Sequence, residues 1–269
     1  AFMYCTNLTS VPTLPNSVTI LRRAFTNCYN ITNASNLPNS VQDLSYTFHQ
    51  CRNLTDAVIP SGTTNAYATF TNCQNLVNVT INVNHDMNMG YTFQNCKKLT
   101  NVTIPNYVTT LDNTFYQCDN ISNSITIPNS VVNMVETFQY CHFNTAPVLP
   151  SNIVNLNTAF AHCPNLINTP TFPNTLTSLY QTFCNCSNLT NVSVLPNSVT
   201  FMDRAFFLCT NLVNAPELPD AINSSYYRNT FEGCTNLITP PSSIPPNAIW
   251  CNYMFKGCRN LENINLSSF

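Results

Sequence analysis

The sequence predicts a β-rich solenoid in which one short unit recurs about twelve times, each unit forming one coil of chain. Three observations predict it. The pattern Phe-x-x-Cys occurs twelve times, successive cysteines of the pattern lie 22 to 25 residues apart, and apolar residues recur at fixed distances between the motifs. Self-similarity at such a period is typical of stacked coils. The motif phenylalanines are Phe2, Phe25, Phe48, Phe70, Phe93, Phe115, Phe138, Phe160, Phe183, Phe206, Phe231 and Phe255.

Each unit offers about seven apolar positions for a core. Leu or Ile follows the motif cysteine by three residues, with Asn144 as the exception. Another apolar residue lies eleven before the next phenylalanine and is followed by Pro, and others lie seven and four before it. A 23-residue period is too short for helix-pair repeats or propeller blades, which need roughly 33 and 40 residues.

Within a unit we expect one short strand, illustrated by residues 99–104. The segment is rich in β-branched residues and ends at Pro105, which lacks the N–H that a strand ladder requires. A second extended piece at 108–111 and a tight turn or single helical turn at 114–117 complete the coil. Because residues 1–5 and 267–269 fall inside units, we expect one domain over 1–269 that is a piece of a longer chain.

The charge balance disfavours several partners. Only 7% of residues are charged and the net charge is −2, so nothing attracts the chain to nucleic acid or to an anionic membrane surface. No apolar stretch approaches the roughly 18 residues of a membrane span, so we expect no membrane insertion in this segment. Asn, Thr, Ser and Pro fill most polar positions instead.

The repeat resembles a known family. The copy at residues 28–51, CYNITNASNLPNSVQDLSYTFHQC, is similar to the leucine-rich repeats of BspA-like, or treponemal-type, surface proteins. The resemblance covers essentially the whole chain. It implies a right-handed leucine-rich repeat solenoid on an extracellular or cell-surface protein that binds matrix proteins, host cells or other microbes, and it implies no catalytic residues. One departure is that Thr often stands where Ala is usual before the motif phenylalanine.

The cysteines allow two interpretations. Twelve of the 14 share one repeat position, so they are either a ladder of buried small apolar side chains or a framework of disulfides or metal thiolates. We favour the buried ladder, because free cysteine is among the most buried residue types and the position recurs beside Phe. Cys184 is expected near the surface and Cys251 in the core.

Catalytic, cofactor and metal sites are not predicted. There are no paired carboxylates, no nucleophile next to a base, and only 4 glycines from which to build a phosphate loop. His85 and Asp86 are the one adjacent acid–imidazole pair, and a loop irregularity explains them better than a catalytic dyad. Asn two residues after the motif cysteine is expected to form an amide ladder, although several such residues also begin glycosylation sequons.

A binding surface is expected where the repeat varies. Aromatic and charged residues that change between units, or that lie in the longer units, are the candidates. They are Tyr29, Arg52, Lys97, Tyr116, His142, Tyr226, Tyr227 and Arg228. The predicted function is a non-enzymatic, surface-displayed recognition or adhesion module for a protein or glycan ligand. The alternative is a structural component of a larger assembly of identical copies, such as a virion fibre, sheath or filament.

Overall fold

The computed structural model describes residues 1–220 and 225–262. The chain divides into an N-terminal half (Ala1–Val131) and a C-terminal half (Val132–Phe269). Part of the longer unit at 220–228, and the closing residues 267–269 that we expect to be a cut unit, lie outside the described residues. In the described ranges the regular elements are short parallel strands joined by turns.

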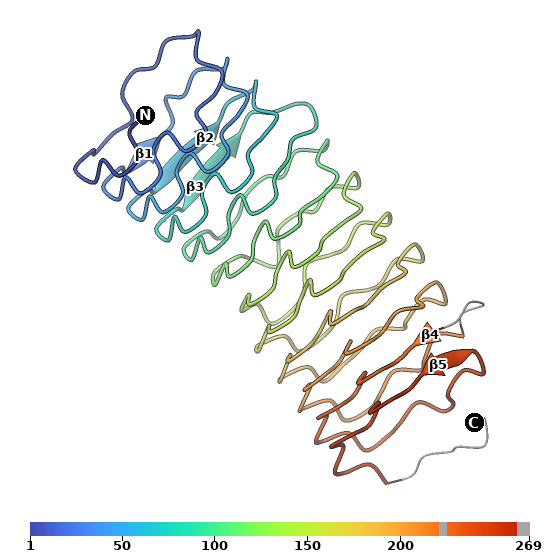
Figure 1. The fold of residues 1–269 in the computed structure, drawn as a ribbon. Helices are drawn as coiled ribbons and strands as arrows, with labels where there is room; N and C mark the ends of the chain where they lie inside the picture. Colours follow the sequence, from blue (N-terminus) through green and yellow to red (C-terminus); the bar gives the residue numbers. More distant parts are fainter. Residues whose placement is uncertain (221–224, 263–269) are drawn as a thin grey trace. The chain divides into compact units, whose positions relative to one another are not determined.

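The N-terminal half contains a three-stranded parallel sheet formed by β1 (Asn33–Ala34), β2 (Asp56–Ile59) and β3 (Asn78–Ile81) in that order. Asp56 pairs with Asn78 and Ala57 with Val79, so the register shift equals one repeat. Consecutive coils therefore lie side by side, as Figure 1 shows for β1 to β3.

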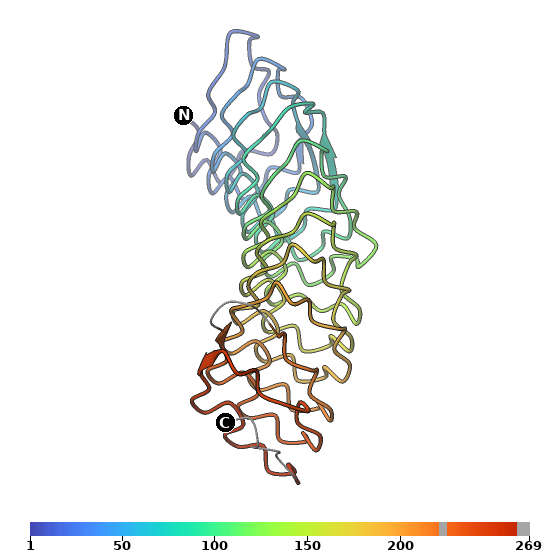
Figure 2. The same ribbon diagram turned by 90° about the vertical axis from the view of Figure 1, so that its right-hand side faces the viewer.

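In the C-terminal half, β4 (Ser225–Tyr226) pairs in parallel with β5 (Ala248–Trp250). Isolated parallel bridges connect other coils of this half, for example Thr145 to Asn168 and Asn168 to Asn191. Figure 2, turned by 90°, shows the same succession of coils within this half.

Among the described residues, the strand expected after each motif cysteine is confirmed only as β1, β2 and β3, and residues 99–104 form no strand. The Val102 N–H donates to the side-chain oxygen of Asn101 over 2.9 Å, which withdraws it from any ladder with the neighbouring coil. Asn side chains commonly compete with secondary structure in this way. The apolar pattern still holds, since Val102 and Ile104 are buried.

A second row of parallel bridges runs five residues before the motif phenylalanines. In the N-terminal half it links Ile20, Asp43, Asn65 and Asn88. In the C-terminal half it links Asn133, Asn155, Ser178, Phe201 and Tyr226. We call these positions the bridge row, and they become important for the candidate site.

The motif phenylalanine lies in a tight turn, as the sequence predicts. Residues two before and two after it have left-handed backbone conformations, for example Arg23 (φ 56°) and Asn27 (φ 59°) around Phe25. The same pair recurs at every later motif, with Gly233 and Gly257 at the second position of the last two. Two left-handed residues four positions apart prevent a continuous helix, because the α-helix requires negative φ throughout.

The core is a stack of motif phenylalanines. In the N-terminal half the rings of Phe2 and Phe25 have centroids 5.3 Å apart, and the stack continues through Phe115 at separations up to 5.8 Å. In the C-terminal half it runs from Phe138 to Phe255 at 5.6 to 5.7 Å. These distances are within the range for favourable aromatic contacts.

The cysteine ladder is confirmed as part of this core. All 14 cysteines are free, and those of the inner units are buried. In most units the motif thiol donates to the carbonyl oxygen of the motif phenylalanine one unit earlier, as from Cys51 to Phe25 at 3.2 Å and from Cys186 to Phe160 at 3.1 Å. Burial raises the pKa of the Cys51 thiol to about 12. Cys184 and Cys251 are both half-buried, so Cys251 is less enclosed than expected.

The asparagine ladder is also confirmed. Asn53 donates its side-chain N–H to the side-chain oxygen of Asn30 at 3.2 Å, and Asn211 donates to Asn188 at the same distance. Asn120 instead bonds to the main-chain oxygen of Lys97 at 2.9 Å. The amides therefore link neighbouring coils through side chains in some units and through the backbone in others.

Candidate recognition surface

The predicted residues that follow the motif cysteine form a row in the N-terminal half. The Arg52 guanidinium lies over the Tyr29 ring at 5.2 Å from its centroid. Lys97 forms an ion pair with Asp119 over 3.5 Å. These contacts join consecutive coils, and exposed pairs of this kind add little stability. The structure thus brings Tyr29 and Arg52 together, whereas Lys97 is occupied by another partner.

Tyr116 lies at another repeat position, and His142 follows its motif cysteine in the C-terminal half. Tyr116 is half-buried in the N-terminal half, one residue after its motif phenylalanine. His142 is exposed in the C-terminal half, and its main-chain oxygen accepts a hydrogen bond from Asn165.

Tyr227 belongs to the core and not to a binding surface. It is completely buried, and its hydroxyl donates to the main-chain oxygen of Pro219 at 3.1 Å. Tyr227 lies four residues before Phe231, where other units carry a core Leu or Met. That spacing is the signal that identifies it, and its ring is not available to a partner. Tyr226 and Arg228, on either side, remain accessible.

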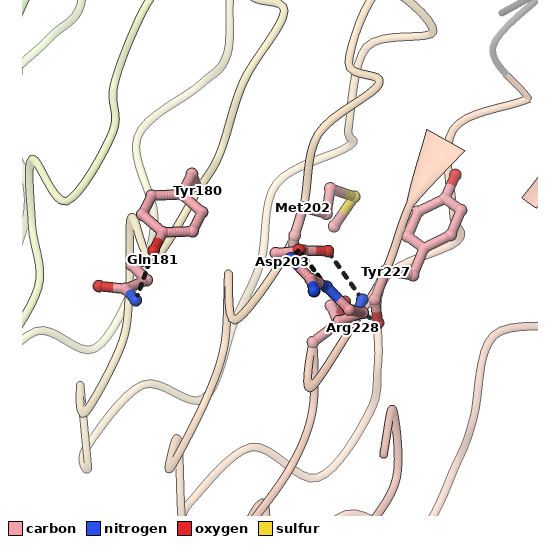
Figure 3. A network of polar contacts seen from close by, with 7 residues as sticks. Tyr180, Gln181, Met202, Asp203, Tyr227 and Arg228 are labelled. Atoms are coloured by element: carbon pink, nitrogen blue, oxygen red, sulfur yellow. Dashed lines mark hydrogen bonds and ion pairs between the residues drawn. The ribbon is translucent and has the colours of Figure 1, made fainter. Parts of the chain in front are cut away.

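Arg228 is held by a buried carboxylate. Asp203, whose side chain is only 3% exposed, accepts from the Arg228 main-chain N–H at 2.9 Å and from its Nε at 2.7 Å. A terminal guanidinium nitrogen of Arg228 also lies 2.7 Å from an oxygen of the Asp203 carboxylate. Figure 3 shows this contact between adjacent coils. Such geometry fixes the orientation of the guanidinium, because Arg presents a planar fork of donors.

Aromatic side chains occupy the bridge row beside this pair. The rings of Phe201 and Tyr226 have centroids 5.2 Å apart, and Tyr180 lies 5.7 Å from Phe201. Trp250, paired with Tyr226 in the β4–β5 ladder, is 45% exposed. The Arg228 guanidinium lies over the Trp250 ring at 5.2 Å. Aromatic and charged side chains therefore lie next to one another across four coils.

In several other units the bridge-row side chain stabilises a turn. Asp43, Asn65 and Asn88 in the N-terminal half each accept the main-chain N–H two residues later, at 2.8 to 3.1 Å. Asn155 does the same in the C-terminal half, at 2.8 Å. This local bond is a common device for fixing a turn.

In three successive units the bridge-row side chain cannot form this local hydrogen bond. Phe201, Tyr226 and Trp250 cannot accept the main-chain N–H, and in the middle unit Asp203 of the preceding coil accepts the Arg228 N–H instead. A position where the sequence departs from its own structural pattern is where function is expected. The aromatic rings are partly exposed and do not enter the core.

A cavity of about 180 Å³ opens beside these rings, lined by Tyr180, Asp203, Arg204, Arg228 and Asn229. We call Tyr180, Phe201, Arg204, Tyr226, Arg228 and Trp250 the aromatic surface. Sequence reasoning identified only Tyr226 and Arg228 among its members. The shared distance of Phe201, Tyr226 and Trp250 from their motif phenylalanines was the available signal, but that row becomes visible as a surface only in the structure.

Nothing comparable surrounds the histidine–aspartate pair. The ring nitrogens of His85 lie 2.9 Å from the main-chain oxygen of Asp86 and 3.1 Å from that of Ser61. The imidazole therefore contacts backbone, as a loop irregularity predicts. In the described ranges no group of three or more His, Cys, Asp or Glu side chains could hold a metal ion, and no helix is long and apolar enough to cross a membrane.

Solved structures show the same fold. A leucine-rich repeat protein from Bacteroides ovatus ATCC 8483 is similar with a TM-score of 0.69 and 23% identity, over 97% of this chain and 73% of that one. A leucine rich cell surface protein from Faecalibacterium prausnitzii A2-165 gives 0.58 and 24%, over 90% and 74%. A leucine-rich repeat protein from Eubacterium ventriosum ATCC 27560 gives 0.54 and 19%, over 98% and 74%.

Sequence comparison identifies the family. A search of curated proteins gave no significant match. The family described as BspA type leucine rich repeat region matches residues 1–121, 66–182, 112–238 and 156–269, which together span the chain. The phenylalanine stack, the cysteine ladder and the parallel pairing at one-repeat register are thus the fold of this repeat. The chain belongs to the BspA-type leucine-rich repeat family.

Proposed function

We propose that this chain is a non-enzymatic recognition module displayed at a cell surface, and that it binds a ligand through the aromatic surface. Its units are expected to form a right-handed solenoid of twelve coils. Family membership and the name of the F. prausnitzii neighbour support surface display.

The observation that carries the proposal is the exchange at the bridge row. Polar residues that stabilise turns in other units are replaced in three successive units by partly exposed aromatic rings. Buried aromatic and Arg side chains dominate binding energy in protein interfaces, and here they are presented on a rigid scaffold. Arg228 is already oriented by Asp203, so little side-chain entropy is lost when a ligand contacts it.

The experiment that tests display is protease treatment of intact cells that express the natural full-length protein. Cleavage of the chain while cytosolic marker proteins stay intact is expected. Protection of the chain until the cells are lysed would contradict the proposal.

Ligand binding is tested separately with purified protein carrying Trp250→Ala. We expect the variant to lose adhesion to target cells or matrix, while retaining the unfolding temperature of the parent. The structural alternative makes a different prediction: the protein associates with identical copies, which light scattering at increasing concentration detects.

A further inference from the structure

The aromatic surface and its charged neighbours carry one more cation than anion. Asp203 neutralises Arg228, and Glu232 pairs with Lys256 at 2.8 Å. The pKa of Glu232 is lowered mainly by its hydrogen bond to Lys256 and also by the nearby charge of Arg204. Arg204 lines the same cavity, is exposed, and forms no salt bridge among the residues described. Its guanidinium lies 5.9 Å from the centre of the Phe207 ring. The cavity is therefore complementary to a single anionic group.

Arg228 can contribute to the same group. A guanidinium has five N–H donors, and Asp203 engages those on Nε and one terminal nitrogen. The remaining donors are free to meet an incoming carboxylate. Because Arg228 is fixed between Asp203 and the Trp250 ring, it offers these donors in one orientation.

The neighbouring rings suit a ligand with flat, weakly apolar faces. Tyr180, Phe201 and Tyr226 follow one another at centroid separations of 5.7 and 5.2 Å, with interplanar angles of 50° and 41°. They are tilted, so each ring leaves part of a face uncovered. A sugar ring has this chemistry, because its C–H face packs on an aromatic ring while its hydroxyls point to the edges.

In the C-terminal half the rest of the bridge row is neutral and polar. Ser178 and Asn155 continue the bridge row beyond Phe201, and their hydroxyl and amide groups can both donate and accept. Sugar hydroxyls have the same dual capacity. An acidic peptide, in contrast, presents several carboxylates and needs more than one unmatched cation. Charge and hydrogen-bonding capacity therefore favour a glycan over a peptide.

We propose that the aromatic surface binds glycans that contain a carboxylated sugar, a uronic or sialic acid. The carboxylate lies in the cavity against Arg204 and Arg228, and sugar rings stack on Tyr226 and Trp250. This inference rests on the proposed recognition function and names its ligand class.

The test is a calorimetric titration of the whole chain with an aldobiouronic acid, a disaccharide that carries one uronic carboxylate, and with sialyllactose. Their methyl esters are the matched neutral probes, since esterification removes the charge and adds only a methyl group. We expect at least one acid to bind and its ester to bind about tenfold more weakly, a loss typical of a charged hydrogen bond. Arg204→Gln is expected to lower the affinity for the acid to that for the ester. Trp250→Ala is expected to lower the affinity for both.

Arg259→Gln, which removes another exposed arginine of this half, is the matched control and should bind like the parent. Thermal unfolding of each variant shows whether a loss of binding reflects a loss of folding. Equal affinity for acid and ester, or no binding of either acid, would overturn the proposal. So would binding of a Glu-rich peptide, sensitive to Arg204→Gln, in place of the sugars.

Failure of this inference differs from failure of the proposed function. If the displayed protein adheres to cells and Arg204→Gln adheres equally well, the recognition function stands and the acidic-glycan assignment is wrong. If proteolysis shows that the chain is not displayed, the functional proposal fails whatever the titration gives.

Discussion

The buried hydroxyl of Thr114 donates to the main-chain oxygen of Met89, one unit earlier, over 3.0 Å. The residue before the motif phenylalanine makes the same bond in other units, as from Thr47 to Leu21 at 2.9 Å. This gives a physical reason for Thr at a position where other units, such as those of Phe25 and Phe160, carry Ala. The hydroxyl adds a link between coils at a position where Ala provides only packing.

Thr114→Val is expected to lower the free energy of unfolding by about 1 kcal/mol. Valine keeps the shape and removes the hydrogen bond, while the Met89 oxygen still accepts from Thr92. Urea denaturation measures the change. The exposed Thr109→Val is the control and should lie within about 0.5 kcal/mol of the parent. An equal effect of both variants would contradict a role for the buried hydroxyl.

The thiol ladder predicts loss of stability at high pH. Burial raises the pKa of Cys51, Cys118 and Cys163 from 9.0 to about 12. A raised folded-state pKa stabilises the folded state fully below the unfolded pKa, and this contribution is lost as pH rises from about 9 towards 12. Each such thiol contributes a slope of about 1.4 kcal/mol per pH unit in that window.

Urea denaturation at successive pH values between 8 and 11 checks this slope, with Cys118→Ala as the comparison. The variant is less stable at pH 8, but its stability should fall less steeply. Parallel pH profiles would show that Cys118 does not contribute.

Native-state labelling with a thiol reagent at pH 8 is expected to modify the exposed Cys5 first. Cys73 and Cys96 should react only after unfolding, because burial raises the pKa of both thiols well above 9.0 and encloses them. Mass spectrometry of labelled peptides identifies the sites. Early labelling of Cys73 would show that the coils open more readily than the fully buried ladder implies.

Thr158→Asn should stabilise the protein. Thr158 has φ 58°, a left-handed conformation that is unfavourable for a β-branched residue and better tolerated by Asn. We expect a gain of about 1 kcal/mol in the free energy of unfolding. Thr171→Asn, an exposed position without positive φ, is the matched control and should change little. A gain at both positions would indicate a cause other than backbone conformation.

Asp203 and Arg228 should be energetically coupled. A double-mutant cycle with Asp203→Asn and Arg228→Gln is expected to give a coupling energy of about 1 to 2 kcal/mol. The value lies below that of a fully buried pair because the Arg228 side chain is 46% exposed to solvent. Additive effects of the two substitutions on unfolding would contradict the orienting role assigned to Asp203.

The repeat could be predicted because its core positions are set by chain spacing alone. Phe, Cys and Leu recur at intervals that place them inside every coil, and the structure stacks the phenylalanines and buries the inner cysteines accordingly. Tyr227 follows the same rule, since its spacing from Phe231 assigns it to the core. Residues 99–104 show the limit, because they keep the apolar pattern but form no strand, and the Val102 N–H bonds to the Asn101 side chain.

The sequence by itself determined the family fold, since a periodic apolar pattern has one way to be buried. Only the tertiary structure decided the candidate site. Phe201, Tyr226 and Trp250 are 24 to 25 residues apart, and they form a surface because parallel pairing brings one position of each coil next to the same position of the following coil. The contact between Asp203 and Arg228 has the same origin, because residues one repeat apart lie close together only when the coils stack.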